Sequence, residues 1–251
     1  IASDLSKGLK PFFICGTVGS TSTLSCDPIK KIGRLAALND CWLHVDSAMA
    51  GTAAVCPEFR YLNDGIELAD SYCFNPHKWM LTNFDCNCFY IKDKKTLISA
   101  LSVVPEYLRN PRALDQPVVD FRDWQIPLGR RFRALKLWFV IRSYGVDGIR
   151  EYLRGHVKIA NKFASWVEAE NHFELTSYTG LNLVCFRVEG DDARNEKLLN
   201  TINETGSIFL SHTIIDGRFS LRLCVGQVRV TEQTVLQAWE VIKTCASGIE
   251  T

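Results

Sequence analysis

Three short apolar runs with high β propensity dominate the N-terminal part of the chain, and a polar or small-residue loop follows each of them. The runs occupy residues 12–18, 42–46 and 71–74, and a segment with helical spacing over 28–38 separates the first two. Strands that alternate with helices favour a largely parallel sheet covered by helices, because a parallel pair needs a crossover connection. The fold class predicted here is therefore α/β.

The C-terminal part shows a different order of elements. Apolar spacing predicts a helix over residues 132–144, which Gly145 and Gly148 end, and a second helix over 147–170. The remaining elements are expected to be strands 173–176, 181–188, 208–213 and 219–225 and helices 193–204 and 231–247. We predict a boundary between 1–135, with a mostly parallel sheet, and 136–251, a smaller α+β domain with an antiparallel sheet.

Lys78 stands directly after the third strand, in the run Asn75-Pro76-His77-Lys78-Trp79. Because apolar residues follow it, we expect its amine to be shielded from water. Shielding lowers the pKa of a lysine and leaves more of the free amine that Schiff-base chemistry needs. Taken alone, such a lysine is more often a surface residue whose stem lies on apolar groups. Its interpretation depends on an acid upstream.

Asp46 ends the second strand, and a loop of small residues that permits a close approach follows it: Ser47, Ala48, Ala50 and Gly51. Open α/β sheets bind ligands at this edge. In pyridoxal phosphate (PLP) enzymes, a lysine holds the cofactor as an imine and an aspartate pairs with its pyridinium nitrogen. Asp46 and Lys78 suit this joint use, although Asp46 alone would also suit a turn or a helix cap.

A set of motifs carries a family resemblance. HVDSAMAG, CPEFR, NPHKW, TNFDC, DWQIPLGRRFRALKLW and NLVCFR occur in order over essentially the whole chain. The chain resembles the C-terminal half of the aromatic L-amino acid decarboxylases, the PLP-dependent group of plant tyrosine and tryptophan decarboxylases and animal dopa decarboxylase. The resemblance implies fold type I, with 1–135 as the C-terminal part of the PLP-binding large domain. Because the chain starts at Ile1 without Met or a leader segment, we expect a fragment.

The resemblance also implies residue roles in the cofactor site. Lys78 would carry PLP covalently, Asp46 would pair with the pyridine nitrogen, Asn75 would bond the phosphate, and Ala48 would pack on the ring face. His77 would support the site from beside the lysine.

Four further roles concern the loops next to these strands. Thr21, in a hydroxyl-rich loop that would also suit a plain turn, would touch the cofactor. Asp27 would support the pyridine side, and its local sequence also predicts an N-cap before Pro28. His44 would orient Asp46.

Tyr107 lies in a stretch with three prolines and no clear period, residues 103–120, which predicts a long loop. Taken alone, it would anchor the loop by packing. By resemblance, decarboxylating members have tyrosine here and aldehyde-forming members phenylalanine, and a phenol can protonate the substrate carbon after carbon dioxide leaves. The loop reaches the partner's site in this family, so Tyr107 would act across a homodimer.

Gly129 would lie in the substrate pocket, where by resemblance plant enzymes for phenolic substrates tend to have serine and those that accept indole tend to have glycine. The neighbouring Arg130, Arg131 and Arg133 would form a carboxylate site or, as we favour, structural ion pairs near a helix start. Met49 and Ser47 depart from the family, which usually has tyrosine and alanine there.

Charge and composition indicate which class of partner this chain binds. The net charge is +1 with a pI near 7.7, and no apolar run has the length of a membrane span, which favours a small-molecule partner over nucleic acid or membrane. The ten cysteines form no CxxC pair, and His156, His172 and His212 fall on separate elements. We expect reduced thiols, no metal site and a cytoplasmic protein.

The predicted activity is PLP-dependent decarboxylation of an aromatic L-amino acid, of the tryptophan, tyrosine or dopa class, to the aryl amine and carbon dioxide. Three alternatives stay open at this point. They are an aromatic acetaldehyde synthase, a truncated inactive paralogue that serves as an interaction subunit, and, without the family, another lysine-imine enzyme such as an aminotransferase.

Overall fold

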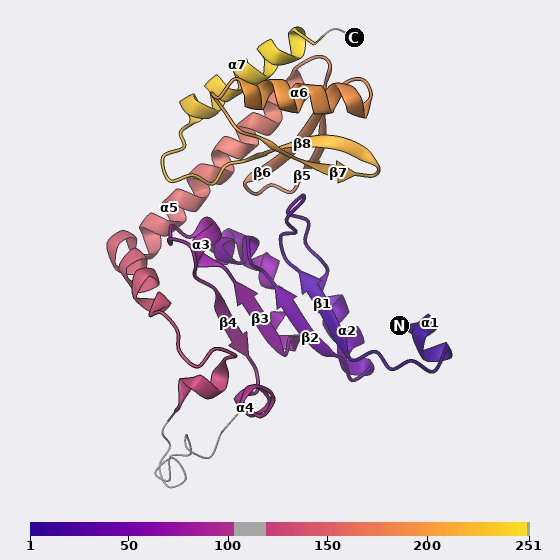
Figure 1. Cartoon of the computed structure of the whole chain (residues 1–251), viewed down its shortest axis with the longest axis vertical. Coiled ribbons are helices and arrows are strands. Elements are labelled where there is room, and N and C mark those ends of the chain that lie inside the picture. The colour runs from indigo at the N-terminus through magenta and orange to yellow at the C-terminus, as the bar shows by residue number, and fades with distance from the viewer. Residues whose placement is uncertain (103–118, 250–251) are drawn as a thin grey trace.

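The structure is a computed structural model that describes residues 1–102 and 119–249. Its first sheet has the order β1-β2-β3-β4, where β1–β3 are parallel and β4 is antiparallel (Figure 1). The strands are β1 (Phe13–Thr17), β2 (Trp42–Asp46), β3 (Ser71–Phe74) and β4 (Cys88–Ile91). The predicted mostly parallel sheet is confirmed.

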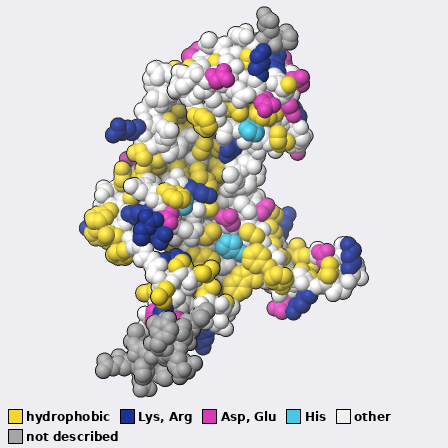
Figure 2. Space-filling view, in the orientation of Figure 1, with side chains coloured by type: hydrophobic (Ala, Val, Ile, Leu, Met, Phe, Trp, Pro, Cys, Tyr) yellow, Lys and Arg dark blue, Asp and Glu magenta, His cyan; other side chains and the backbone are white. Residues whose placement is uncertain are grey.

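One face of the first sheet is covered and the other is open. The covering elements are α2 (Ile29–Leu38) and the 3-10 helices η1 (Ala50–Val55), η2 (Pro57–Asn63) and η3 (Ile66–Leu68). Leu43 and Val45 of β2 are buried. On the opposite face, Phe13 and Phe89 are 51% and 49% exposed. Figure 2 shows hydrophobic side chains gathered over the first sheet.

The second sheet is antiparallel throughout, with the order β5-β6-β8-β7. Its elements are β5 (Phe173–Tyr178), β6 (Leu183–Val188), α6 (Asp192–Glu204), β7 (Ser211–Ile215), β8 (Arg218–Cys224) and α7 (Glu232–Ser247). Strand β6 is buried on both sides: Val184 and Phe186 join a core with the helices, whereas Leu183 and Cys185 join the core of the first sheet. The predicted α+β part is confirmed, and β6 joins it to the first sheet.

Helix α5 (Arg133–Ala169) runs from beside the first sheet to the second one (Figure 1). The sequence predicted two helices, and α5 has a kink at Gly145, whose φ of 64° is open to glycine without a Cβ clash. Leu153 packs in the first core and Phe163 in the second. The two cores therefore meet within α5, and the domain boundary at residue 135 stays a prediction.

One local prediction was wrong. Asp27 does not cap α2; its Oδ2 accepts a hydrogen bond from the Thr17 amide at 2.7 Å instead. Asp93 caps α4 (Lys94–Leu101) by accepting from the Lys95 amide at 2.9 Å. The other described helices are α1 (Ala2–Ser6), α3 (Pro76–Trp79) and η6 (Phe121–Trp124).

Two general features concern the described part of the chain. No helix within it is both long and apolar enough to cross a membrane. All ten cysteines have free thiols.

Trp79 fastens α3 to α5. Its ring is fully buried, and its Nε1–H donates to Nδ1 of the buried His156 at 3.1 Å. Burial lowers the pKa of His156, so the ring is neutral and Nδ1 can accept. Protonation would place an N–H against the indole N–H and remove this bond.

His156 should therefore make unfolding depend on pH. Its folded pKa lies below the unfolded value of about 6.5, so the unfolded chain binds more protons and the free energy of unfolding falls as pH drops below that value. We expect His156→Asn, which keeps an acceptor but does not titrate, to reduce this slope in urea unfolding at pH 7.5, 6.5 and 5.5.

Trp79→Phe is the matched variant, because it removes the donor and keeps an aromatic ring. Part of the pH dependence of the free energy of unfolding should remain in both variants, since burial also lowers the pKa of His44. An unaltered slope in His156→Asn would contradict this account.

Candidate functional site

The loops after β2 and β3 are joined by main-chain hydrogen bonds at the carboxyl edge of the first sheet. The Ser47 amide donates to the Cys73 carbonyl at 2.9 Å, and the Asn75 amide donates to the Ala48 carbonyl at 3.1 Å. Asp46 lies between these loops and pairs with Cys73 in the register of the two strands. Ligands of open α/β sheets bind at such an edge.

Asp46 is half-buried and uses only one of its carboxylate oxygens within the described chain. Oδ1 accepts from the Ala48 amide at 2.9 Å and lies 3.7 Å from the Cys73 thiol, which can donate to it. Oδ2 has no hydrogen-bond partner among the residues that the structure describes. This oxygen is available to accept an N–H from a ligand.

Lys78 lies on α3, directly after the loop of Asn75, and its side chain is exposed. The expected shielding from water is wrong for the described chain. The reason is helical geometry: Pro76 and Trp79, three residues apart, share one face and are buried, which turns Lys78 away from the core. The amine is consequently accessible to solvent.

Asn75 and His77 are both tied to the segment that precedes β4. The Asn75 Oδ1 accepts a hydrogen bond from the Asn87 side-chain amide. His77 Nδ1 lies 2.7 Å from the carbonyl oxygen and 3.0 Å from the amide nitrogen of Cys86. Contact of either residue with a cofactor stays a prediction, whereas their support of this segment is a feature of the structure.

Thr21 is exposed in a loop that the second sheet holds in place. From β8, Arg222 donates through Nε to the Ser22 carbonyl at 2.8 Å and through Nη2 to the Thr21 carbonyl. Its Nη1 donates to the Ser211 hydroxyl at 2.8 Å. Sequence reasoning missed Arg222, because nothing local links it to a loop so distant in the chain.

Asp27 lies next to the carboxyl end of β1. By accepting from the Thr17 amide, it holds the last residue of β1, and Thr17 pairs with Asp46 in the sheet register. Gly19 begins the loop that follows, with φ +83°, and an added Cβ would lie 2.5 Å from the Ala50 Cβ. Glycine therefore lets the loop after β1 approach the loop after β2.

Gly129 lies near His77, in a cavity of about 440 Å³ whose lining also includes Asn87 and Asp85. A Cβ added to Gly129 would meet no atom within 4 Å, so the position has room for a side chain. The structure thus brings Gly129 next to one of the predicted cofactor residues.

The arginines after Gly129 act mainly as ion-pair partners. Arg133 Nη2 lies 2.8 Å from Asp85 Oδ2, and Arg131 Nη2 lies 3.1 Å from Asp85 Oδ1. The hydrogen bond from Arg133 is the main reason that the pKa of Asp85 falls to about 2. The structural interpretation is confirmed for Arg131 and Arg133.

Three remaining predictions have different outcomes. Tyr107 lies outside the described residues, and its role stays a prediction. Ser47 is fully buried, and Met49 packs against the first core. No group of three or more His, Cys, Asp or Glu side chains that could hold a metal ion occurs within residues 1–102 and 119–249.

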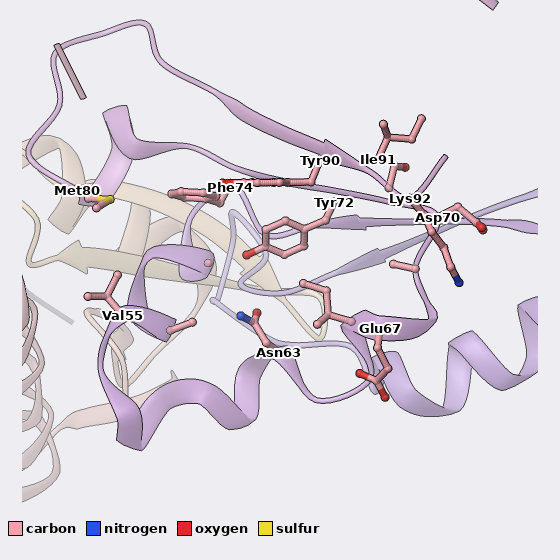
Figure 3. Close-up of a pocket in the computed structure, with 15 residues that line it drawn as sticks. Val55, Asn63, Glu67, Asp70, Tyr72, Phe74, Met80, Tyr90, Ile91 and Lys92 are labelled. Carbon is pink, nitrogen blue, oxygen red and sulfur yellow. The ribbon is translucent and has the colours of Figure 1, made fainter. Parts of the chain in front are cut away.

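A separate cavity of about 610 Å³ lies on the covered face of the first sheet, away from Asp46. Tyr72, Phe74 and Tyr90 lie along it, and Met80 and Val55 lie at one end (Figure 3). None of the predicted cofactor residues lines this cavity, so the chemistry is not expected there.

Comparison with known proteins identifies the family. The pyridoxal-dependent decarboxylase conserved domain matches residues 1–189. Tyrosine decarboxylase 2 of Narcissus pseudonarcissus is 46% identical over 98% of this chain and 51% of that protein. Phenylacetaldehyde synthase of Arabidopsis thaliana is 44% identical over 98% of the chain and 52% of that protein.

A solved structure matches the fold. The crystal structure of Oryza sativa TDC with PLP and tryptamine superimposes with a TM-score of 0.95 at 39% identity, over 100% of this chain and 53% of that one. The fold is that of the PLP-dependent decarboxylases. The chain belongs to the pyridoxal-dependent decarboxylase family, and it spans about half the length of the relatives it matches.

Arg222 should control the order of the loop that carries Thr21. We expect Arg222→Ala to speed hydrogen exchange of the loop amides and to lower the free energy of unfolding by about 1–2 kcal/mol, because main-chain carbonyls lose a charged donor. Arg218→Ala is the control, since Arg218 lies on the same strand and pairs with Glu174 instead. Equal exchange in both variants would contradict the assignment.

Proposed function

We propose that this chain belongs to a PLP-dependent decarboxylase that converts an aromatic L-amino acid to its aryl amine and carbon dioxide. One observation carries the proposal. Asp46 ends β2 and has an oxygen that no described residue bonds, and the exposed Lys78 comes after β3, the adjacent parallel strand. The loops after the two strands are joined by a hydrogen bond from the Asn75 amide to the Ala48 carbonyl. Because the chain spans about half of its relatives, the activity is proposed for the whole protein.

The residues present fit the chemistry of PLP. Asp46 Oδ2 can accept the N–H of a pyridinium ring, and the accessible Lys78 amine can bond the cofactor's aldehyde carbon. Thr21 has a hydroxyl and Asn75 an amide that can bond ring substituents or phosphate. When bound, PLP supplies an electron sink for the pair released as the substrate carboxylate leaves.

The chain's own residues would position the cofactor and supply a proton to the substrate. Asp46 would accept the N–H of the ring and so favour its protonated form, and Ala48 would offer a flat contact for the ring. Lys78 would hold the cofactor through its amine. Tyr107 of the neighbouring subunit in a homodimer donates its phenolic proton to the substrate carbon.

The substrate is proposed to be tryptophan, tyrosine or dopa. Gly129 favours acceptance of the larger indole ring, because the position has free space where relatives for phenolic substrates tend to have serine. An aromatic acetaldehyde synthase is the second candidate, since a phenylacetaldehyde synthase is nearly as similar as a tyrosine decarboxylase. Tyr107 favours the decarboxylase. The ten free thiols favour a reducing compartment, which we propose to be the cytoplasm.

Lys78 is tested by trapping the cofactor. In the full-length protein, Lys78→Ala should lose the PLP adduct that borohydride fixes, because the adduct needs the amine of this lysine. Lys78→Arg is the control that keeps the positive charge without the nucleophile. Mass spectrometry of the reduced protein gives the measurement, and an adduct that persists in Lys78→Ala would overturn the lysine assignment. A wild type that takes up no PLP would favour an inactive paralogue.

Tyr107 is tested by the product. We expect Tyr107→Phe to divert turnover from amine to aldehyde, because phenylalanine cannot protonate the substrate carbon. Dissolved oxygen and water would then be consumed, and ammonia and hydrogen peroxide would be released beside carbon dioxide. Amine, peroxide and carbon dioxide are measured with tryptophan, tyrosine and dopa. If wild type already releases peroxide in step with carbon dioxide, the protein is an aldehyde synthase.

A further inference from the structure

An alternating row of side chains connects β2 and β3 and ends at Asp46. Trp42 Nε1 donates to the Ser71 hydroxyl at 2.9 Å, and that hydroxyl lies 2.8 Å from His44 Nδ1. His44 Nε2 lies 3.7 Å from the Cys73 sulfur, which in turn lies 3.7 Å from Asp46 Oδ1. The parallel register, which pairs His44 with Ser71 and Asp46 with Cys73, produces this alternation.

Trp42, the first member of the row, determines the direction in which hydrogen bonds are donated along it. An indole N–H can only donate, so the Ser71 oxygen accepts from Trp42 and its own O–H is free to donate to His44 Nδ1. Burial lowers the pKa of His44, which keeps the ring neutral with a single proton. If Nδ1 accepts, that proton is on Nε2, which points to the Cys73 sulfur.

Cys73 continues the row in the same direction. Burial, and after it the negative charge of Asp46, raises the pKa of the thiol, so the sulfur keeps its proton. It can then accept from His44 Nε2–H and donate its S–H to Asp46 Oδ1. Together with the Ala48 amide, the thiol gives Oδ1 two donors and leaves Oδ2 free.

We propose that Cys73 and His44 are positioning residues for Asp46, which hold Oδ1 against the sheet and present Oδ2 to the ring nitrogen of the cofactor. The proposal rests on the proposed function, since it assigns the ligand of Oδ2 as a pyridinium ring. Cys73 acts directly on the carboxylate, and His44 acts through Cys73. Trp42 and Ser71 fix which ring nitrogen of His44 carries the proton.

The test compares two cofactors that differ at a single ring atom. PLP and its deaza analogue, in which carbon replaces the ring nitrogen, both have the aldehyde and the phosphate, but only PLP can bond Asp46 through the ring. The dissociation constant of each is measured by absorbance titration of the full-length protein, and the ratio of the two constants isolates the contact with Asp46. Asp46→Ala has no carboxylate to bond the ring nitrogen, so it gives the smallest preference for PLP over the analogue.

We expect Cys73→Ala to reduce the preference for PLP over the deaza analogue by about 3- to 10-fold, the effect of losing one typical net hydrogen bond, because a thiol is a weak donor. Cys73→Ser, which keeps a donor, should change it less than twofold. A purely structural defect would weaken both cofactors equally, so an unchanged ratio in Cys73→Ala would overturn the positioning role. If wild type does not bind PLP at all, the proposed function fails as well.

A second measurement needs no cofactor. The ¹⁵N chemical shifts of His44 report which ring nitrogen is protonated, and we expect the Nε2–H form in wild type. Ser71→Ala should weaken this preference, because Nδ1 then loses its donor. A dominant Nδ1–H form in wild type would reverse the direction of the row and overturn the assignment.

Discussion

The parallel pairing of β2 with β3 is the constraint on which the site depends. In its register Asp46 lies beside Cys73, and the loops that follow are bonded between Ala48 and Asn75. Side chains alternate along a strand, so a slip of one residue would turn Asp46 to the covered face of the sheet. The same slip would break the row of hydrogen bonds that ends at its carboxylate. Main-chain pairing therefore sets the geometry before any side chain acts.

In α3, Trp79 provides the packing contact and its neighbour Lys78 provides the exposed amine. Trp79 is fully buried and bonded to His156, which anchors the short helix to α5. Lys78 consequently projects from the opposite side and stays exposed. The described residues therefore do not shield this amine from water. Any shielding of this amine has to come from groups beyond them, such as the cofactor itself or further parts of the whole protein.

Much of the fold could be predicted, because periodicity and turn residues act over short distances. Strands β1–β3 of the first sheet and the helix end at Gly145 were visible in this way. Asp46 and Lys78 could be singled out because Asp46 ends a strand and Lys78 comes shortly after the next one. The local sequence predicted that Asp27 caps a helix, but its carboxylate bonds the Thr17 amide instead. Which one forms depends on the tertiary position of β1.

Cys73 and Arg222 could not be found from local pattern, for different reasons. Cys73 was interpreted as a buried thiol, although strand alternation places it on the face of Asp46 once the register is known. Arg222 had no local sign at all. Its bonds to Thr21 and Ser22 form only after the second sheet packs on the first, where the doubly buried β6 brings them together. The loop of Thr21 is thus shaped by both sheets, and β8 of the second sheet contributes to the structure of the candidate site.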